Sequence, residues 1–519
     1  MTDIPPQTEE APDQPLHDRV NNRSHRPSSP AFREFMGGNW GERIPLDLHR
    51  SETADVVGDR HSAIGRLFPG DRLVIPAGQL TTRSNDTDYR FRAHSAFAHL
   101  TGLGGEMEPD SVLVLHPSAD GPTIGDEDST HEAILYFVPR ASRTSEEFYA
   151  DSRYGEFWVG ARPSLSEMQT LTGIRCEHFD TLRDALAKDA GAVQVRVVTN
   201  SDTHIETMVN EVREQAGLPA GEDAHTTDAA LVEALSELRL TKDALEVKEM
   251  EKAVAATKAG FENILRSLPR AVDHPRGERV IEGAFTSVAR EYGNGLGYET
   301  IAASGNHANT LHWMNNSGTV RPGDLILIDA GVELDSLYTA DITRTFPVSG
   351  TFTPIQATVY EAVLAAAEAA FDRARQPGVR FRDLHDSAQQ VLADYLDAWG
   401  VLPVSVEEAL SPNGQQHRRW MPHGTCHHLG LDVHDCAQAR QELYQDALIE
   451  PGMVFTIEPG LYFRADDLAV PEEMRGIGVR IEDDIVIDPD GTPRRLSEDI
   501  PRTTADVEEW MRSIQATHS

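Results

Sequence analysis

The feature that most constrains this chain is a set of acidic side chains within apolar, strand-like segments. Asp329 ends the apolar run of DLILIDAGVE, and the alternation of YTADITRTFPV places Asp341 on one face with two threonines. Glu458 in MVFTIEPGLYF and Glu482 in GVRIEDDIVI lie in similar runs, and Arg480 shares the face of Glu482. Each carboxylate would cost several kcal/mol if it were buried without a partner. The fold must therefore supply protons or cations to these four groups.

A fifth group of candidate ligands lies in the segment MPHGTCHHLGLDVHD, which contains four histidines: His423, His427, His428 and His434. An imidazole beside oxygen ligands favours Mn²⁺, Co²⁺, Fe²⁺ or Zn²⁺ over Ca²⁺ or Mg²⁺. Arg480 can neutralise only part of the carboxylate charge, whereas two divalent ions would balance it. Because two bridged ions also activate a shared water, the joint pattern predicts a dimetal hydrolase. Each of these acidic residues or histidines, taken alone, would more often have a structural role than bind a metal.

The length and the hydropathy pattern predict more than one domain. The chain has 519 residues, and domains usually contain about 100–200. Residues 1–30 are acidic and rich in proline, and they are predicted to form a disordered tail. Residues 31–235 alternate helical and strand-like segments, which indicates an α/β domain with a mixed sheet. A polar segment at 217–228 reads as a linker, and a helix over 241–268 with Thr241 as its N-cap opens an α+β domain at 236–519.

Composition excludes several classes of partner. The formal net charge is −37, which argues against nucleic acid and against an anionic membrane surface. Three cysteines are too few and too scattered for a disulfide framework. No apolar run reaches the roughly 18 residues that a membrane span needs, and the first residues lack the basic and apolar regions of a secretory signal. A cytoplasmic location is therefore expected.

These motifs resemble those of the pita-bread metallopeptidases, and within them aminopeptidase P (Xaa-Pro aminopeptidase) and its relative prolidase. The match runs in order through LILIDAGVE, YTADITRTFPVSG, HGTCHHLGLDVHD, FTIEPGLY and GVRIEDD, while FRAHSAFAHLTGL and GEFWVGARPS resemble the N-terminal domain of these enzymes. The resemblance implies an α+β fold. An N-terminal α/β domain of the creatinase and aminopeptidase P type precedes a C-terminal pita-bread catalytic domain with a curved, mostly antiparallel sheet.

The resemblance also implies a reaction and a set of site residues. A metal-bridging hydroxide would hydrolyse the bond between an N-terminal residue and proline, and Glu458 would carry the proton. His312 would lie near the proline ring, and His423 and His434 on the substrate side. His434 would bond the scissile carbonyl, and Arg480 would orient the ligands beside the substrate. Two divalent ions per subunit, first of all Mn²⁺, would be held by Asp329, Asp341, His427, Glu458 and Glu482. The family also implies a homodimer or homotetramer.

Several alternatives stay open at this point. Prolidase shares the fold but cleaves Xaa-Pro dipeptides, and methionine aminopeptidases share the five-ligand pattern but usually lack the large N-terminal domain. A metal-free scaffold or a creatinase-type enzyme would have lost ligand residues, whereas all five positions here hold competent side chains. Cys426 is expected to be a small buried residue rather than a thiolate ligand, and His428 is expected to serve packing.

Overall fold

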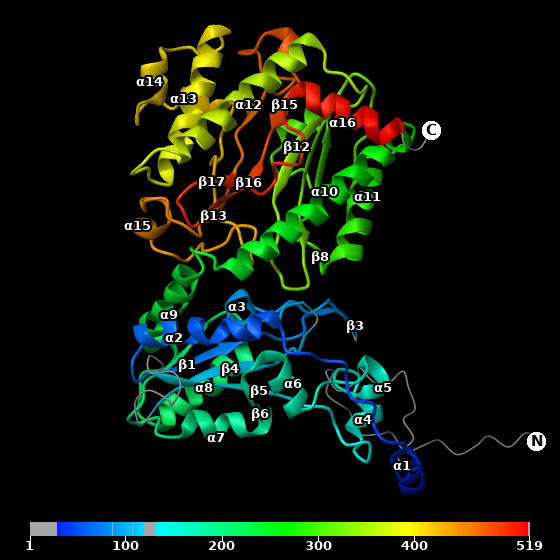
Figure 1. The fold of residues 1–519 in the computed structure, drawn as a ribbon, viewed down its shortest axis with the longest axis vertical. Coiled ribbons are helices and arrows are strands. Elements are labelled where there is room, and N and C mark those ends of the chain that lie inside the picture. The colour runs from blue at the N-terminus through cyan, green and yellow to red at the C-terminus, as the bar shows by residue number, and fades with distance from the viewer. Residues whose placement is uncertain (1–28, 86, 106, 119–129, 517–519) are drawn as a thin grey trace, which may run out of the picture.

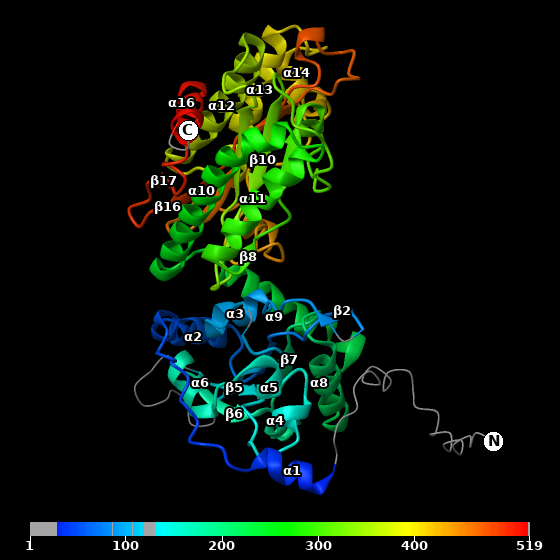
Figure 2. The ribbon, with the colours of Figure 1, turned by 90° about the vertical axis from the view of Figure 1, so that its right-hand side faces the viewer.

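The computed structural model describes residues 29–516, apart from 86, 106 and 119–129, and shows two bodies stacked along the long axis (Figures 1 and 2). The N-terminal half forms the lower body in Figure 1, and the C-terminal half forms the upper one. Most of the predicted tail at 1–30 lies outside the described residues. Helix α1 (Pro30–Gly37) begins where that tail was expected to end, and Ser29 caps it through the amide of Phe32.

The lower body is built on a five-stranded mixed sheet in the order β6-β5-β4-β1-β7. Strand β1 pairs antiparallel with β4 and parallel with β7, and β5 pairs parallel with β6. The mixed sheet predicted from the apolar runs is therefore present. The strands of this body are β1 (Arg72–Pro76), β2 (Thr82–Ser84), β3 (Thr87–Asp88), β4 (Val112–Pro117), β5 (His131–Phe137), β6 (Arg175–His178) and β7 (Val195–Val197).

Helices cover both faces of this sheet, since apolar side chains point from it in both directions: Leu73 packs in one cluster and Val74 in another. The helices of this body are α2 (Val57–Leu67), α3 (Ser95–Thr101), α4 (Glu147–Ala150), α5 (Glu156–Val159), α6 (Leu165–Thr172), α7 (Leu182–Ala187) and α8 (Thr203–Gln215).

Two helices connect the bodies, α9 (His225–Leu238) and α10 (Ala244–Val272). Helix α9 occupies part of the segment that was predicted to be a linker. Thr241 is not the N-cap of the long helix: Asp243 caps it, accepting hydrogen bonds from two backbone amides in a capping box with Glu246. Thr241 instead pairs with Met453 in an isolated bridge, which fixes its backbone in an extended form. We propose that the domains meet at α9, which contains the predicted boundary near residue 235.

The upper body contains strand pairs that are all antiparallel among the described residues. Strand β10 lies between β9 and β12, and β16 lies between β13 and β17. The predicted strand GVRIEDDIVI is broken into β15 and β16, so Glu482 lies between two strands. The strands are β8 (Gly295–Leu296), β9 (Ile301–Ser304), β10 (Leu325–Ala330), β11 (Val332–Glu333), β12 (Ile342–Pro347), β13 (Val454–Ile457), β14 (Gly460–Tyr462), β15 (Gly478–Arg480), β16 (Asp483–Ile487) and β17 (Pro493–Arg495).

Helices surround these strands, with α10 beside α11 and α12 beside α13 (Figure 1). Thr353 starts α12 in a capping box with Gln356, and the apolar stripe of α12 enters the core. No helix of the described chain is both long and apolar enough to span a membrane. The remaining helices are α11 (Gly277–Tyr292), α12 (Pro354–Ala374), α13 (Arg382–Ala398), α14 (Val406–Leu410), α15 (Gln441–Tyr444) and α16 (Thr504–Ala516).

Candidate functional site

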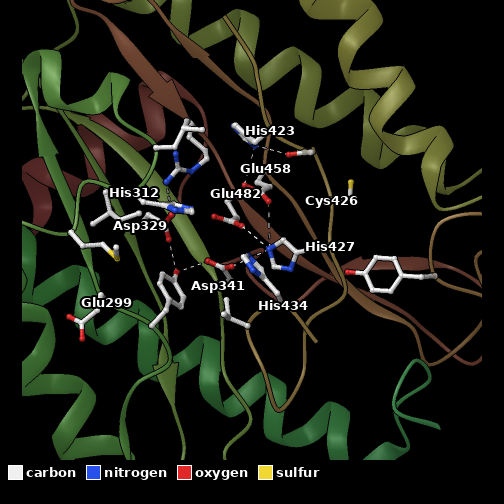
Figure 3. A pocket seen from close by; sticks show the side chains of 18 residues that line it. Glu299, His312, Asp329, Asp341, His423, Cys426, His427, His434, Glu458 and Glu482 are labelled. Atoms are coloured by element: carbon white, nitrogen blue, oxygen red, sulfur yellow. Dashed lines mark hydrogen bonds and ion pairs between the residues drawn. The ribbon is translucent and has the colours of Figure 1, made fainter. Parts of the chain in front are cut away.

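The predicted ligand residues converge on one cavity of the upper body, with a volume of about 530 Å³. Asp329 comes from β10, Asp341 immediately precedes β12, and Glu458 immediately follows β13. Glu482 lies between β15 and β16, and His427 reaches the cavity from a segment without regular structure (Figure 3). Five different segments of the upper body thus place their polar side chains in one cavity.

Three of these groups are close enough to share one ion: the ligand atoms of Asp341, His427 and Glu482 lie within 4.8 Å of one another. His427 Nε2 is 3.3 Å from Asp341 Oδ2 and 3.5 Å from Glu458 Oε1. Asp329 lies beside them, joined to Asp341 through a shared hydrogen-bond donor. The group combines four carboxylates and one imidazole, which is the donor set that suits Mn²⁺, Co²⁺, Fe²⁺ or Zn²⁺.

The electrostatics of the cavity favour a bound cation. Burial, followed by the charges of Asp341 and Glu458, raises the pKa of Glu482 well above its usual range. Burial also raises the pKa of Glu458 to about 7, against the opposing charge of His427. Burial raises the pKa of Asp329 even though Arg480 lies beside it. These carboxylates therefore resist ionising together, and divalent cations would relieve that resistance.

Asp341 and His427 behave as an ion pair in the protein alone. Burial favours the neutral form of Asp341, but the hydrogen bond to His427, the charge of His427 and the hydrogen bond from Tyr298 together outweigh burial and lower its pKa. Burial would likewise lower the pKa of His427, yet the hydrogen bond to Asp341 and the charge of Glu458 raise it to about 9. Both shifts share a cause, because a protonated imidazole stands among carboxylates.

The predicted substrate-side histidines line the same cavity. His423 Nε2 lies 2.7 Å from the hydroxyl of Tyr462, and its Nδ1 lies 3.6 Å from Glu458 Oε2. His434 is exposed, and its ring meets that of His427 edge to face at 4.4 Å. His312 lines the cavity from the loop at 305–318. The structure thus brings all three histidines to the group of carboxylates (Figure 3).

Arg480 lies beneath the carboxylates, where it donates to Asp329 Oδ2 at 2.5 Å and to Thr343 Oγ1 at 3.1 Å. Its third contact is with the hydroxyl of Tyr462 at 3.1 Å. It is buried, with 4% of its surface exposed, so its guanidinium mainly holds protein groups. Thr343 in turn donates to Glu482 at 2.6 Å.

Sequence reasoning missed two tyrosines in the site. Tyr298 contacts Asp329 at 2.6 Å and Asp341 at 2.5 Å through its single hydroxyl. Tyr462 links His423 to Arg480. Tyr462 could have been found from its place in FTIEPGLY, whereas Tyr298 lies in a loop with no sequence signal that sets it apart.

Two further predictions concern the residues beside His427. His428 is fully buried and stacks on Phe381 with ring centroids 4.5 Å apart, which agrees with a packing role. Cys426 is only partly buried and lines the cavity, which differs from the buried position expected. Burial and the charge of Glu458 raise the pKa of its thiol well above the usual range, and this disfavours the thiolate that metal binding requires.

The fold and the site together define a metallopeptidase with an additional N-terminal domain. Residues 248–489 match the model of metallopeptidase family M24, and residues 58–198 match the N-terminal domain of aminopeptidase P. The chain is 46% identical over 510 residues to Xaa-Pro aminopeptidase 1 of Streptomyces coelicolor, which covers 98% of this chain and 97% of that protein. It is 31% identical to Xaa-Pro aminopeptidase of Escherichia coli, over 87% of this chain and 96% of that one.

Solved structures agree with this result. Aminopeptidase P from E. coli in a low-pH form superposes with a TM-score of 0.74 at 28% identity, covering 90% of this chain and 99% of that chain. Proline aminopeptidase P II from Yersinia pestis gives a TM-score of 0.72 at 29% identity, covering 89% and 100%. The chain belongs to the aminopeptidase P family of M24 metallopeptidases.

Proposed function

We propose that this enzyme removes the N-terminal residue from peptides with proline at the second position, using two divalent metal ions. The observation that supports it most directly is the convergence of five ligand-type side chains on one cavity in a member of this family. The proposed ligands are Asp329, Asp341, His427, Glu458 and Glu482. When bound, the two ions would balance the carboxylates and lower the pKa of a water between them, making it the nucleophile that attacks as hydroxide.

Glu458 is the proposed proton carrier. It would take a proton from the attacking water and deliver it to the leaving proline nitrogen. The nitrogen of an X–Pro bond carries no hydrogen, so departure of proline requires such a donor. Carboxyl groups are common general acids and bases, since they can accept a proton in one step and release it in the next. The position of Glu458 beside His423 and His427 supports this role.

The three histidines are proposed to bind substrate. His434 would donate to the scissile carbonyl oxygen as negative charge develops on it, a role in which a fixed donor stabilises the transition state. His423 would act beside it, held by Tyr462. His312 would contact the proline ring from the opposite loop. Arg480 is proposed to orient Asp329 and to balance charge beneath the substrate, as its buried position suggests.

The metal, the assembly state and the location are further parts of the proposal. The donor set suits Mn²⁺ as the first choice, with Co²⁺, Fe²⁺ and Zn²⁺ as alternatives. A homodimer or homotetramer follows from the family resemblance. All three cysteines are free, which suits the reducing cytoplasm. Peptides remain the proposed partners, and the net charge of −37 argues against nucleic acid.

Hydrolysis of Arg-Pro-Pro and of Arg-Pro by metal-stripped enzyme, with and without Mn²⁺, tests this function. Metal-dependent release of Arg from the tripeptide is the expected result. Cleavage of the dipeptide alone would identify a prolidase instead. Failure to cleave either peptide with any of the four metals would contradict the peptidase assignment and favour the metal-free scaffold.

A further inference from the structure

The loop that carries His434 is held from two sides. This His434 loop, residues 429–435, is fixed at its ends within the upper body: the amide of Leu429 donates to Val454, and the amide of Asp435 donates to His428. Its middle is contacted from the N-terminal domain. The carbonyl of Leu431 and the carboxylate of Asp432 both accept hydrogen bonds from residues near the start of α3.

Two residues of the N-terminal domain make these contacts. Ser95, the first residue of α3, donates its hydroxyl to Asp432 Oδ1 at 2.6 Å. Arg92 donates to the carbonyl of Leu431 at 2.7 Å and to Asp432 Oδ1 at 3.3 Å. Both bonds to Asp432 involve a charged acceptor, which makes them stronger than bonds between neutral groups.

Arg92 is itself held in place from the other side. Its Nε donates to Glu333 Oε2 at 2.7 Å, and Glu333 also accepts from the side-chain amide of Asn294. Glu333 is buried, with 4% of its surface exposed. The guanidinium therefore joins a buried carboxylate of the upper body to the His434 loop, and it has little freedom to take another position.

Asp432, which accepts two of these hydrogen bonds, lies two residues before His434, whose side chain faces the cavity. Val433 and His434 both line it, and the ring of His434 meets that of His427 at 4.4 Å. Only Val433 separates Asp432 from His434, so loss of the contacts at Asp432 removes an anchor within about 8 Å of chain from His434. Misplacing a group by about 1 Å can lower a rate by about a hundredfold.

We propose that Ser95 and Arg92 are positioning residues for His434, so that docking of the N-terminal domain sets the geometry of the active site. The inference rests on the proposed function, since it gives His434 a role in the reaction. Neither residue lines the cavity. Their effect on catalysis would therefore pass through the His434 loop, and it would vanish in a variant that lacks the His434 imidazole.

A double-mutant cycle between Ser95 and His434 tests this coupling. Ser95→Ala removes the hydroxyl bond to Asp432, and we expect kcat for Arg-Pro-Pro to fall by about tenfold with KM little changed. In the His434→Ala background, the same change should alter kcat by less than about twofold. Arg92→Lys should retain more activity than Arg92→Ala, since lysine keeps the charge but loses the planar fork.

The matched control is Glu52→Gln. Glu52 joins the N-terminal domain to α10 through an ion pair with Lys248 at 2.6 Å, far from the His434 loop in sequence and on the exposed surface. The substitution Glu52→Gln should leave kcat within about twofold of the wild-type value. Equal loss of kcat on Ser95→Ala in both backgrounds, or no loss in either, would overturn the inference.

Hydrogen exchange of the backbone amides of residues 429–435 gives a second test that does not depend on activity. Ser95→Ala should speed exchange in this segment, while Glu52→Gln should leave it unchanged. Unchanged exchange in Ser95→Ala would overturn the inference even if the wild-type enzyme were inactive. An inactive wild-type enzyme with faster exchange in Ser95→Ala would instead contradict the proposed function alone.

Discussion

Tyr298 bonds to Asp341 through a short contact, with the phenolic oxygen 2.5 Å from Asp341 Oδ1. The same oxygen lies 2.6 Å from Asp329 Oδ1, so one hydroxyl spans two proposed metal ligands. Burial, followed by the charges of both aspartates, raises the pKa of Tyr298 well above its usual range. The phenol therefore stays protonated, and it orients the two carboxylates relative to each other.

Tyr298→Phe should weaken metal binding because it removes this shared donor. Loss of a group that orients metal ligands usually costs about 10–100-fold in affinity, and we expect a loss in that range for Mn²⁺ measured by calorimetric titration. Tyr360→Phe is the matched control, since it removes a tyrosine hydroxyl bonded to the carbonyl of Arg502, away from the cavity. Equal Mn²⁺ affinity in the two variants would refute the orienting role.

The part of the site that lies on strands can be predicted from the sequence. Alternation along a strand fixes side-chain direction every two residues, so Asp341 and Thr343 are expected on one face. Thr343 indeed reaches Glu482 from that face. The assignment of five ligands comes from the family resemblance, because alternation does not say which strands meet.

Other contacts depend on tertiary packing, which no local pattern encodes. Tyr298 reaches both aspartates only because β9 pairs with β10 in a register that sets Ile301 opposite Asp329. Threonine is a favourable residue for an N-cap, but the backbone pairing of Thr241 with Met453 overrides that preference. Ser95 and Asp432 are separated by more than three hundred residues, and nothing near either one indicates their contact.

Glu458→Gln tests the proposed proton carrier. The amide cannot take a proton from water, so kcat for Arg-Pro-Pro should fall by about 10²–10⁴-fold, the usual contribution of a general acid–base group. Glu299→Gln, which alters an exposed carboxylate at the edge of the same cavity, should keep kcat within about twofold. Mn²⁺ content is measured for both variants. A fall in kcat that excess Mn²⁺ fully restores would assign Glu458 to metal binding alone.

Glu278→Gln tests a buried carboxylate that anchors the loop carrying His312. Glu278 is fully buried and accepts from His307, from Trp313 Nε1 at 2.8 Å and from the amides of Ser304 and Gly318 at the two ends of the loop. A glutamine offers one acceptor atom where two are used, which leaves buried donors unpaired. We expect a loss of about 2–4 kcal/mol in unfolding free energy.

The kinetic effect of Glu278→Gln should appear mainly in KM. The loop positions His312 near the substrate, whereas the proposed metal ligands come from other segments. Glu291→Gln, an exposed change near the end of the same helix, serves as the control and should alter neither stability nor KM. A fall in kcat with unchanged KM would argue against a substrate-binding role for this loop.

The stabilising effect of Mn²⁺ should grow as the pH rises from about 6 to about 8. The pKa of Glu458 is raised to about 7 from 4.5, and that of His427 is raised to about 9 from 6.5. The folded, metal-free protein thus binds protons that the unfolded chain has released. The stability that Glu458 and His427 each contribute to the metal-free protein is fully present below the pKa of that group in the unfolded chain. It is lost as the pH rises through the pKa of the group in the folded protein.

Metal ions need these ligands deprotonated, so protons and Mn²⁺ compete for the same groups. The melting temperature of the metal-free enzyme should therefore fall between pH about 6 and about 8, while the increase caused by a fixed excess of Mn²⁺ should become larger. Asp341, whose pKa is lowered, titrates below this window. Calorimetric scans with and without Mn²⁺ at both pH values measure the effect. An increase in melting temperature that is equal at both values would show that proton release from His427 and Glu458 does not accompany metal binding.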